Sequence, residues 1–307
     1  MLSKPILALT RDRSKKAQIN DFCGDPAEWF DTEYFREHNL NATSFDFFVD
    51  WEKEIVCDEI WIKRISDSEQ IQEQNEKELM DLISLCDGKE NANRLYSFLS
   101  YQRMIEKYML FRDVPEEYWE NGDEKVVELD LSRYTSSRSL ISHFNAEEIQ
   151  EKIRELRKRP ASIGEAGLNY STSYLEGYLS RKPFFWPGDV DTLLYDDNNK
   201  VIAVVEFKKH TASSKIPFAS QGITNYLKKD ILKYKSLALL RDKFETDLFV
   251  LYYPIPSNIK YVIIEKIEGN PDSLHASRRI ELDLPNRRLS DSMKNFAERF
   301  ITDVLNR

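Results

Sequence analysis

Apolar and polar residues alternate most clearly between residues 186 and 210, in the stretch "WPGDVDTLLYDDNNKVIAVVEFKKH". The pattern predicts strands over 189–195 and 200–208, joined by the turn "DDNN" as an antiparallel hairpin. Four more elements are predicted further along the chain: a helix over 219–244, strands over 247–255 and 260–267, and a helix over 290–307. Strands interleaved with helices indicate an α/β layer architecture for this half of the chain.

The first half of the chain mixes strand-like runs with helical patterns. Short strands are predicted over 6–10, 44–51, 54–65 and 126–131. Helices are predicted from Asp25, over 68–88, over 90–111, and over 145–159 with Asn145 as its N-cap. No internal repeat is visible in the sequence. We therefore expect a mixed helical and strand domain over residues 1–155 and an α/β domain over residues 156–307.

Composition narrows the class of protein. With 307 residues and 41% hydrophobic content, the chain can bury a large core. It has neither a signal-peptide pattern nor an apolar stretch approaching membrane length, so we expect a soluble, cytoplasmic protein without a membrane partner. Three widely separated cysteines, with no histidine at ligand spacing, argue against structural zinc: Cys23, Cys57 and Cys86.

Charge is unevenly distributed along the chain. The net charge is −9, but residues 1–150 hold 18 Lys and Arg against 32 Asp and Glu, whereas residues 151–307 hold 26 against 21. Residues 207–241 contain eight basic residues but a single acidic residue, Asp230. Such a patch can follow a phosphate backbone, although a solvated helix face rich in lysine is an equally simple interpretation.

Three carboxylates and one ammonium are predicted to meet at the end of the hairpin. If the turn covers 196–199, Asp189 lies opposite Glu206 and Asp191 lies one step along the diagonal. Lys208 shares their face because side chains alternate along a strand. Carboxylates without His or Cys suit Mg²⁺ or Mn²⁺. The predicted chemistry is metal-assisted hydrolysis of a phosphodiester, with Lys208 stabilising negative charge or orienting the water.

With "GDVD" followed by "EFK" across a hairpin, the sequence resembles the PD-(D/E)XK nuclease superfamily, which includes restriction endonucleases. The resemblance covers residues 160–265. It implies a restriction-endonuclease-like core, with a four-stranded mixed sheet flanked by helices, and a Mg²⁺-dependent nuclease activity. By position, it assigns Asp191 and Glu206 as metal-binding carboxylates, Lys208 as the catalytic lysine, and the carbonyl of Phe207 as a further metal ligand.

The sequence departs from the family pattern directly before the aspartate, where Val190 replaces the usual proline. The first metal ligand is therefore Asp189 or Asp191, and we favour Asp191. Many members of the family also have a glutamate on the helix before the hairpin. Glu165 and Glu176 both qualify for this role.

Some branches of the family complete the site with a Gln and a Tyr on the following helix, and Gln221 with Tyr226 resembles that pair. His210, just beyond the strand, is expected to be a surface residue and not a catalytic base. The residues predicted to contact nucleic acid are Tyr226, Lys209, Lys228 and Lys229.

The predicted function is that of a metal-dependent nuclease acting on nucleic acid, with DNA favoured by the membership of the family. Phage defence, restriction or DNA repair is the implied biological setting. Two alternatives stay open: a non-catalytic subunit that binds nucleic acid or protein, and an RNA-cleaving effector. Residues 1–155 are expected to regulate the nuclease or bind a basic partner protein, and a homo-oligomer is also left open.

Overall fold

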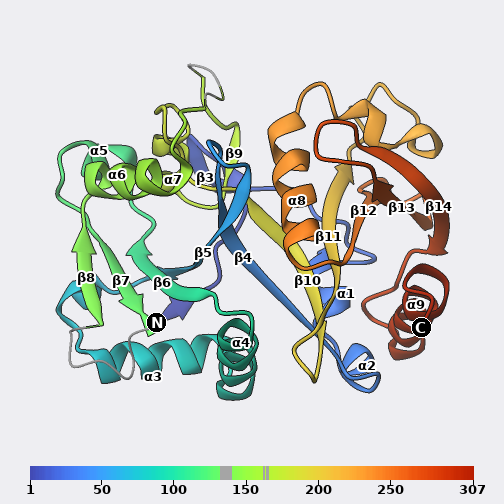
Figure 1. The fold of residues 1–307 in the computed structure, drawn as a ribbon, viewed down its shortest axis with the longest axis horizontal. Coiled ribbons are helices and arrows are strands. Elements are labelled where there is room, and N and C mark those ends of the chain that lie inside the picture. Colours follow the sequence, from blue (N-terminus) through green and yellow to red (C-terminus); the bar gives the residue numbers. More distant parts are fainter. Residues whose placement is uncertain (132–139, 162, 164–165) are drawn as a thin grey trace. The chain divides into compact units, whose positions relative to one another are not determined.

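The computed structural model describes residues 1–131, 140–161, 163 and 166–307, and the chain divides into two units (Figure 1). Unit 1 consists of Met1–Ala17 and Phe45–Asp189, and unit 2 consists of Gln18–Ser44 and Val190–Arg307. Within the described residues, no helix is long and apolar enough to cross a membrane.

The fold is α/β, as predicted, and its main sheet is mixed. Over the described residues this sheet has eleven strands, of which β1 (Leu2–Ser3) pairs with β5 beside the main path. The other strands follow the order β14 (His275–Asp283), β13 (Tyr261–Glu268), β12 (Asp247–Pro254), β11 (Val201–His210), β10 (Asp189–Asp196), β4 (Leu40–Asp50), β5 (Ile55–Ser66), β6 (Ile105–Arg112), β7 (Val126–Asp130) and β8 (Ile141–Phe144). A small second sheet contains β3 (Asp12–Lys16), β2 (Ala8–Leu9) and β9 (Tyr170–Ser171).

The strands of unit 1 begin with an antiparallel pair, β4 and β5. Helices α3 (Glu76–Asp87) and α4 (Lys89–Tyr101) then lead to β6, which runs parallel to β5. β7 and β8 follow as antiparallel neighbours, and α6 (Ala146–Arg157) comes next in the chain. In Figure 1, α3 lies on one side of β6, β7 and β8, and α5 (Glu116–Glu120) and α6 lie on the other.

Local sequence signals explain where these helices begin. Asn75 and Asn145 each accept a hydrogen bond from the backbone N–H three residues later. The glutamate at that third position, Glu78 or Glu148, accepts a hydrogen bond from the backbone N–H of the asparagine. These are capping boxes, which satisfy backbone groups that the first helical turn leaves without partners. The N-cap predicted at Asn145 is therefore confirmed.

Unit 2 follows the same plan as unit 1. β10 and β11 form an antiparallel hairpin, α8 (Ile231–Lys243) leads to the parallel strand β12, and β13 and β14 follow as antiparallel neighbours. A final helix, α9 (Ser290–Arg299), occupies the place that α6 has in unit 1 and continues as a π-helical turn over Phe300–Val304. The two units thus share strand order and pairing directions, although the sequence showed no repeat.

The strand order shared by the two units was not visible from the sequence because β6 was predicted to be part of a helix. The helix predicted over 90–111 ends at Tyr101, and Ile105–Arg112 is the strand β6. Arg103 adopts a φ of 59°, which a right-handed helix cannot continue through. Met109, which was predicted to extend the helix, lies instead opposite Lys63 in a parallel ladder with β5.

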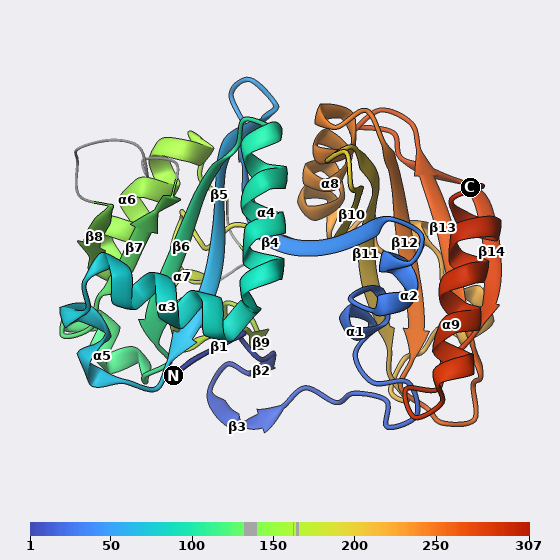
Figure 2. The same cartoon turned by 90° about the horizontal axis from the view of Figure 1, so that it is seen from below.

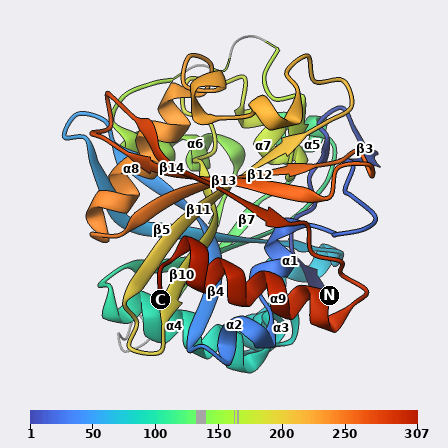
Figure 3. The ribbon, with the colours of Figure 1, turned by 90° about the vertical axis from the view of Figure 1, so that its right-hand side faces the viewer.

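The predicted division at residue 155 also differs from the structure. Residues 18–44 belong to unit 2, because the aromatic residues of α1 (Pro26–Phe30) complete its core. The Trp29 ring lies 5.3 Å from the Phe296 ring, and the Phe30 ring lies 4.9 Å from the Phe300 ring. Figure 3 shows α1 and α2 (Glu33–Arg36) gathered beside α9.

A segment predicted to belong to the C-terminal domain likewise belongs to unit 1. Residues 156–189, predicted to start the C-terminal domain, belong to unit 1. Within this segment, Leu175 and Leu179 of α7 (Tyr174–Leu179) and Trp186 are buried in the core that also contains Trp61. Each unit is therefore completed by a segment that precedes the hairpin of the other unit in sequence.

Glu106 on β6 is a buried carboxylic acid in unit 1. Its side chain is 2% exposed, and neither oxygen has a hydrogen-bond partner among the described residues. Burial, with a smaller contribution from the negative charge of Asp87, raises the pKa of Glu106 to about 8. A neutral, protonated Glu106 is therefore the form that the folded unit favours.

Replacing Glu106 with Gln should remove a pH-dependent cost of folding. The folded chain holds this proton more tightly than the unfolded chain, so wild-type stability falls as the pH rises from about 4.5 to about 8. Glu106→Gln should raise the urea unfolding midpoint at pH 8.5, equivalent to about 2–4 kcal/mol, and have little effect at pH 5.

Tryptophan fluorescence suits this measurement, because four of the five tryptophans lie in unit 1: Trp51, Trp61, Trp119 and Trp186. The exposed Glu117 on α5 provides the control Glu117→Gln, which should leave the pH profile unchanged. Parallel pH profiles for wild type and Glu106→Gln would contradict the assignment of a raised pKa.

Candidate functional site

The hairpin of unit 2 pairs Asp191 with Glu206. The observed register places Thr192 opposite Val205, and its continuation by one residue places Asp191 opposite Glu206. The predicted register, with Asp189 opposite Glu206, was therefore wrong by two residues. One residue of this difference comes from a bulge between Leu194 and Tyr195, and the other comes from the turn, where Asp196 and not Tyr195 pairs with Lys200.

Glu206 is a fully buried carboxylate. Its side chain is 0% exposed, and neither oxygen accepts a hydrogen bond from a backbone N–H or a hydroxyl among the described residues. Two ammonium groups neutralise it: Nζ of Lys233 lies 2.7 Å and Nζ of Lys208 lies 3.4 Å from Oε1. The apolar part of β11 is thus followed by a buried negative charge, which two lysine side chains neutralise.

Lys208 is enclosed on several sides. Its side chain is 15% exposed, and its Nζ lies 3.3 Å from Oδ2 of Asp230. The same Nζ lies 5.3 Å from the ring centroids of both Tyr226 and Tyr234, a distance at which aromatic rings attract cations. Burial, with a smaller contribution from the charge of Glu206, raises the pKa of Tyr234, so this phenol stays protonated.

Asp191 lies next to the backbone of the opposite strand. Its Oδ2 accepts a hydrogen bond of 2.6 Å from the backbone N–H of Phe207. The ring of Phe207 points to the other face of the sheet and stacks on Phe30 of α1 at 5.7 Å. Asp191, Glu206 and Lys208 therefore share the face covered by α8, which Figure 2 shows alongside β10 and β11.

Gln221 and Tyr226 form a chain of hydrogen bonds with His210. The Tyr226 hydroxyl donates to Oε1 of Gln221 at 2.6 Å, and Nε2 of Gln221 lies 3.1 Å from Nδ1 of His210. His210 is buried, which corrects the prediction of a surface residue, and its burial lowers its pKa. The Tyr226 ring thus connects Gln221 with Lys208.

Two residues of the site were missed by the sequence analysis, Asp230 and Lys233. They lie at the start of α8, three positions apart, which places them on one helical face. The helix predicted over 219–244 begins only at Ile231, because short 3₁₀ turns occupy the residues before it. The available signal was Asp230 itself: an N-cap at this position would have placed Asp230 and Lys233 together at the start of α8.

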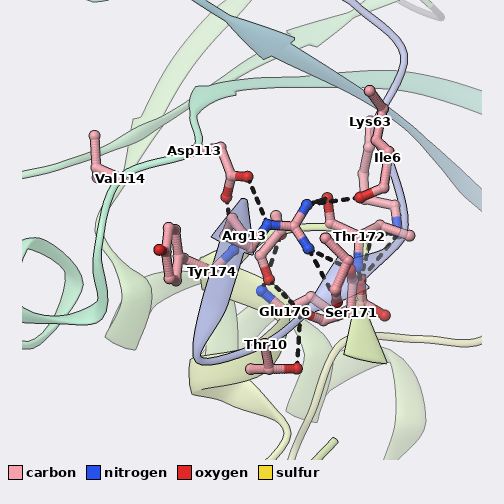
Figure 4. A network of polar contacts seen from close by, with 12 residues as sticks. Ile6, Thr10, Arg13, Lys63, Asp113, Val114, Ser171, Thr172, Tyr174 and Glu176 are labelled. Carbon is pink, nitrogen blue, oxygen red and sulfur yellow. Dashed lines mark hydrogen bonds and ion pairs between the residues drawn. The ribbon is translucent and has the colours of Figure 1, made fainter. Parts of the chain in front are cut away.

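Neither of the two predicted upstream glutamates is among the described residues of unit 2. Glu165 lies outside the described residues. Glu176 belongs to unit 1, where it accepts a 2.7 Å hydrogen bond from the backbone N–H of Thr172 and lies 3.9 Å from Nζ of Lys63 (Figure 4). Asp189, the alternative metal ligand, also falls in unit 1 and interacts electrostatically with Lys63.

In the cluster around Lys63 in unit 1, the lysine ammonium balances the negative charge of the neighbouring carboxylates. Nζ of Lys63 lies 3.3 Å from Oδ2 of Asp46, which also accepts a hydrogen bond from the Trp186 ring nitrogen at 2.8 Å. Burial raises the pKa of Asp46 to about 7, although the Lys63 ammonium opposes the shift. A structural ion cluster, with lysine as its cation, accounts for these residues.

The matching face of unit 1 carries different residues at the hairpin positions. Arg64 and Tyr108 both bind Asp87 at the end of α3, so this face of β5 and β6 is covered by the connecting helices, as α8 covers unit 2. β5 places the buried Ile60 and Ile62 on that face, where β11 has carboxylate and ammonium groups.

The predicted nucleic-acid contacts divide into two kinds. Lys228 and Lys229 are exposed just before α8, whereas Nζ of Lys209 binds the carbonyl of Gln18 at 3.0 Å. Counted by unit, the charge is less segregated than by sequence halves: unit 1 holds 24 basic and 31 acidic residues, and unit 2 holds 20 and 22. The basic character is local to the residues around α8.

A metal at this site would have few protein ligands. Among the described residues, no group of three or more His, Cys, Asp or Glu side chains is placed to hold a metal ion. Asp191 and Glu206 provide two neighbouring carboxylates, and among the described residues the buried oxygens of Glu206 accept no hydrogen bond from a backbone N–H or a hydroxyl. Mg²⁺ fits such a set, because it keeps several waters and binds through one or two carboxylates and substrate phosphate.

Comparisons with protein-family models, with curated proteins and with solved structures found no match for this chain.

Arg13 holds together the segments that surround Glu176 (Figure 4). Its Nε donates to Asp113 at 2.9 Å, and its Nη2 donates to the carbonyls of Ile6 at 2.7 Å and Thr172 at 2.8 Å. Its Nη1 donates to the carbonyl of Ser171. One guanidinium thus ties the N-terminal segment to β9 and to the loop after β6.

Arg13→Lys should destabilise unit 1 by about 1–3 kcal/mol, because one ammonium cannot reproduce a planar fork that binds a carboxylate and several carbonyls. Urea unfolding followed by tryptophan fluorescence gives this value. Arg11→Lys is the matched control, since Arg11 is exposed in the same segment. Equal losses for both variants would mean that the fork contributes nothing specific.

Proposed function

We propose that unit 2 is a metal-dependent nuclease of the PD-(D/E)XK type that hydrolyses phosphodiester bonds in DNA. The observation that carries the proposal is the pairing of Asp191 with Glu206 across a hairpin, with Lys208 on the same face. The common plan of a hairpin, a crossover helix and a parallel strand supports it, since the resemblance implies a mixed sheet flanked by helices.

Asp191 and Glu206 are the residues that would hold Mg²⁺ or Mn²⁺, with the carbonyl of Phe207 as a further ligand. The ion would polarise the phosphate and lower the pKa of the attacking water. Glu206 is a strong candidate because its buried charge already requires a cation beside it. Asp191 is held in place by the backbone N–H of Phe207, which donates to its Oδ2 at 2.6 Å, so its carboxylate is oriented beside Glu206.

Lys208 acts as the residue that stabilises negative charge on the phosphate. Asp230 and the two tyrosine rings hold its ammonium in place, so little side-chain freedom is lost when substrate binds. The chain from His210 through Gln221 to Tyr226 fixes one of these rings. Gln221 and His210 are thus positioning residues.

Substrate binding would involve the exposed Lys228 and Lys229, which lie directly before Asp230 in the chain. Two ammonium groups beside the site favour a polyanion without reading its sequence. Because the buried Ile60 and Ile62 occupy the matching positions of the unit 1 hairpin, the proposed reaction centre would belong to unit 2.

A second candidate function is a non-catalytic module that binds nucleic acid. The ion pair between Lys233 and Glu206 favours it, because that pair already neutralises the buried carboxylate without any metal. The two candidates make opposite predictions about hydrolysis, so one set of assays separates them.

Asp191→Asn and Glu206→Gln should each lower nuclease activity at least a hundredfold, because each removes a negative charge that binds the metal. Lys208→Met should have a similar effect on the rate of cleavage. The measurement is cleavage of labelled single- and double-stranded DNA and RNA by the full-length chain with Mg²⁺, with Mn²⁺ or with EDTA.

Glu281→Gln is the matched control for these variants, because Glu281 is an exposed glutamate on β14 of the same unit. It should cut as well as wild type. Binding without cleavage in either metal would favour the non-catalytic module, and cleavage of RNA alone would favour the RNA-cleaving effector. Full activity in Asp191→Asn would rule out the proposed site.

A further inference from the structure

Lys233 is the closest cation to the buried carboxylate of the proposed site. Its Nζ lies 2.7 Å from Oε1 of Glu206, compared with 3.4 Å for Nζ of Lys208. Lys208 also binds Asp230, so its charge is divided between two carboxylates. Lys233 therefore provides the shorter of the two ion pairs that neutralise Glu206.

The side chains of Lys208 and Lys233 differ in how accessible they are to water. The side chain of Lys208 is 15% exposed and enclosed by two tyrosine rings, whereas that of Lys233 is 33% exposed. Lys233 extends from the first turn of α8 on a flexible four-carbon stem, and an ammonium at the surface is readily hydrated. Of the two lysine side chains, that of Lys233 is therefore the more accessible to water.

A divalent cation and the Lys233 ammonium cannot both lie against Oε1 of Glu206, because like charges in a poorly solvated site repel strongly. We propose that Lys233 is a built-in competitor for the metal: it neutralises Glu206 when the metal is absent and is displaced when the metal binds. This inference rests on the proposed metal site. It identifies the residue that sets the metal affinity of that site.

Lys233→Met tests the proposal, because methionine keeps an unbranched stem and removes the charge. Mn²⁺ should bind this variant at least tenfold more tightly than wild type, as measured by calorimetric titration of the full-length chain. Without metal, the thermal unfolding midpoint of the variant should fall, since Glu206 loses its nearest cation. Mn²⁺ should raise that midpoint more in the variant than in wild type.

Lys235→Met is the matched control. Lys235 lies two residues along the same helix, and its Nζ binds Asp272 at 2.8 Å, away from Glu206. This variant should bind Mn²⁺ as wild type does. Lys233→Arg keeps the charge and should also keep the wild-type affinity, and Lys233→Gln provides a second neutral variant if Lys233→Met does not fold.

The outcomes separate this inference from the proposed function. If wild type binds Mn²⁺ and the neutral variants bind it no more tightly, Lys233 is not a competitor, but the metal site stands. If neither wild type nor the neutral variants bind Mn²⁺, both proposals fail. If adding Glu206→Gln to Lys233→Met leaves the gain in affinity intact, the gain arises elsewhere and the inference is wrong.

Discussion

The need to neutralise a carboxylate buried in the sheet determines how the candidate site is built. Glu206 ends an apolar strand, and transfer of an isolated charge into such surroundings costs many kcal/mol. The nearest cations come from its own strand and from α8, in Lys208 and Lys233. The first turn of α8 is therefore tied to β11 by charge as well as by packing. Asp230 and the tyrosine rings follow from the same requirement, because the charge of Lys208 must itself be held in place.

The common plan of the two units makes it possible to compare the residues of the candidate site with their counterparts in unit 1. Both units form a hairpin, a helical connection and a parallel strand, so both present the same sheet face to their connecting helices. In unit 1, the buried Ile60 and Ile62 occupy that face of β5, although Glu106 and the ion pair between Arg64 and Asp87 lie on the same face. In unit 2, charged residues interrupt the core. The two similar frameworks therefore carry different side chains at equivalent hairpin positions, which is typical of a site placed on a shared fold.

The sequence predicted the hairpin of unit 2 and the residues at its end, because alternation and turn residues act over short distances. It did not predict the register, since the pairing of Asp196 with Lys200 at the turn and the bulge between Leu194 and Tyr195 each shift it by one residue. It also missed β6, whose apolar residues fit a helix as well as a buried strand. The exchange of residues 18–44 was not predictable from local patterns, because it depends on contacts between aromatic residues far apart in the chain.

The spacing of the motif residues also occurs in unit 1, with a tryptophan in place of the glutamate. Asp46, Trp61 and Lys63 have the same separations along the chain as Asp191, Glu206 and Lys208. The first set lies on the face of the sheet that packs against α7, whereas the second lies on the face that packs against the connecting helix. Because side chains alternate, a shift of one residue between two similar strands moves a motif to the opposite face. The residue spacing of a motif therefore indicates a site only when the face of the strand is also known.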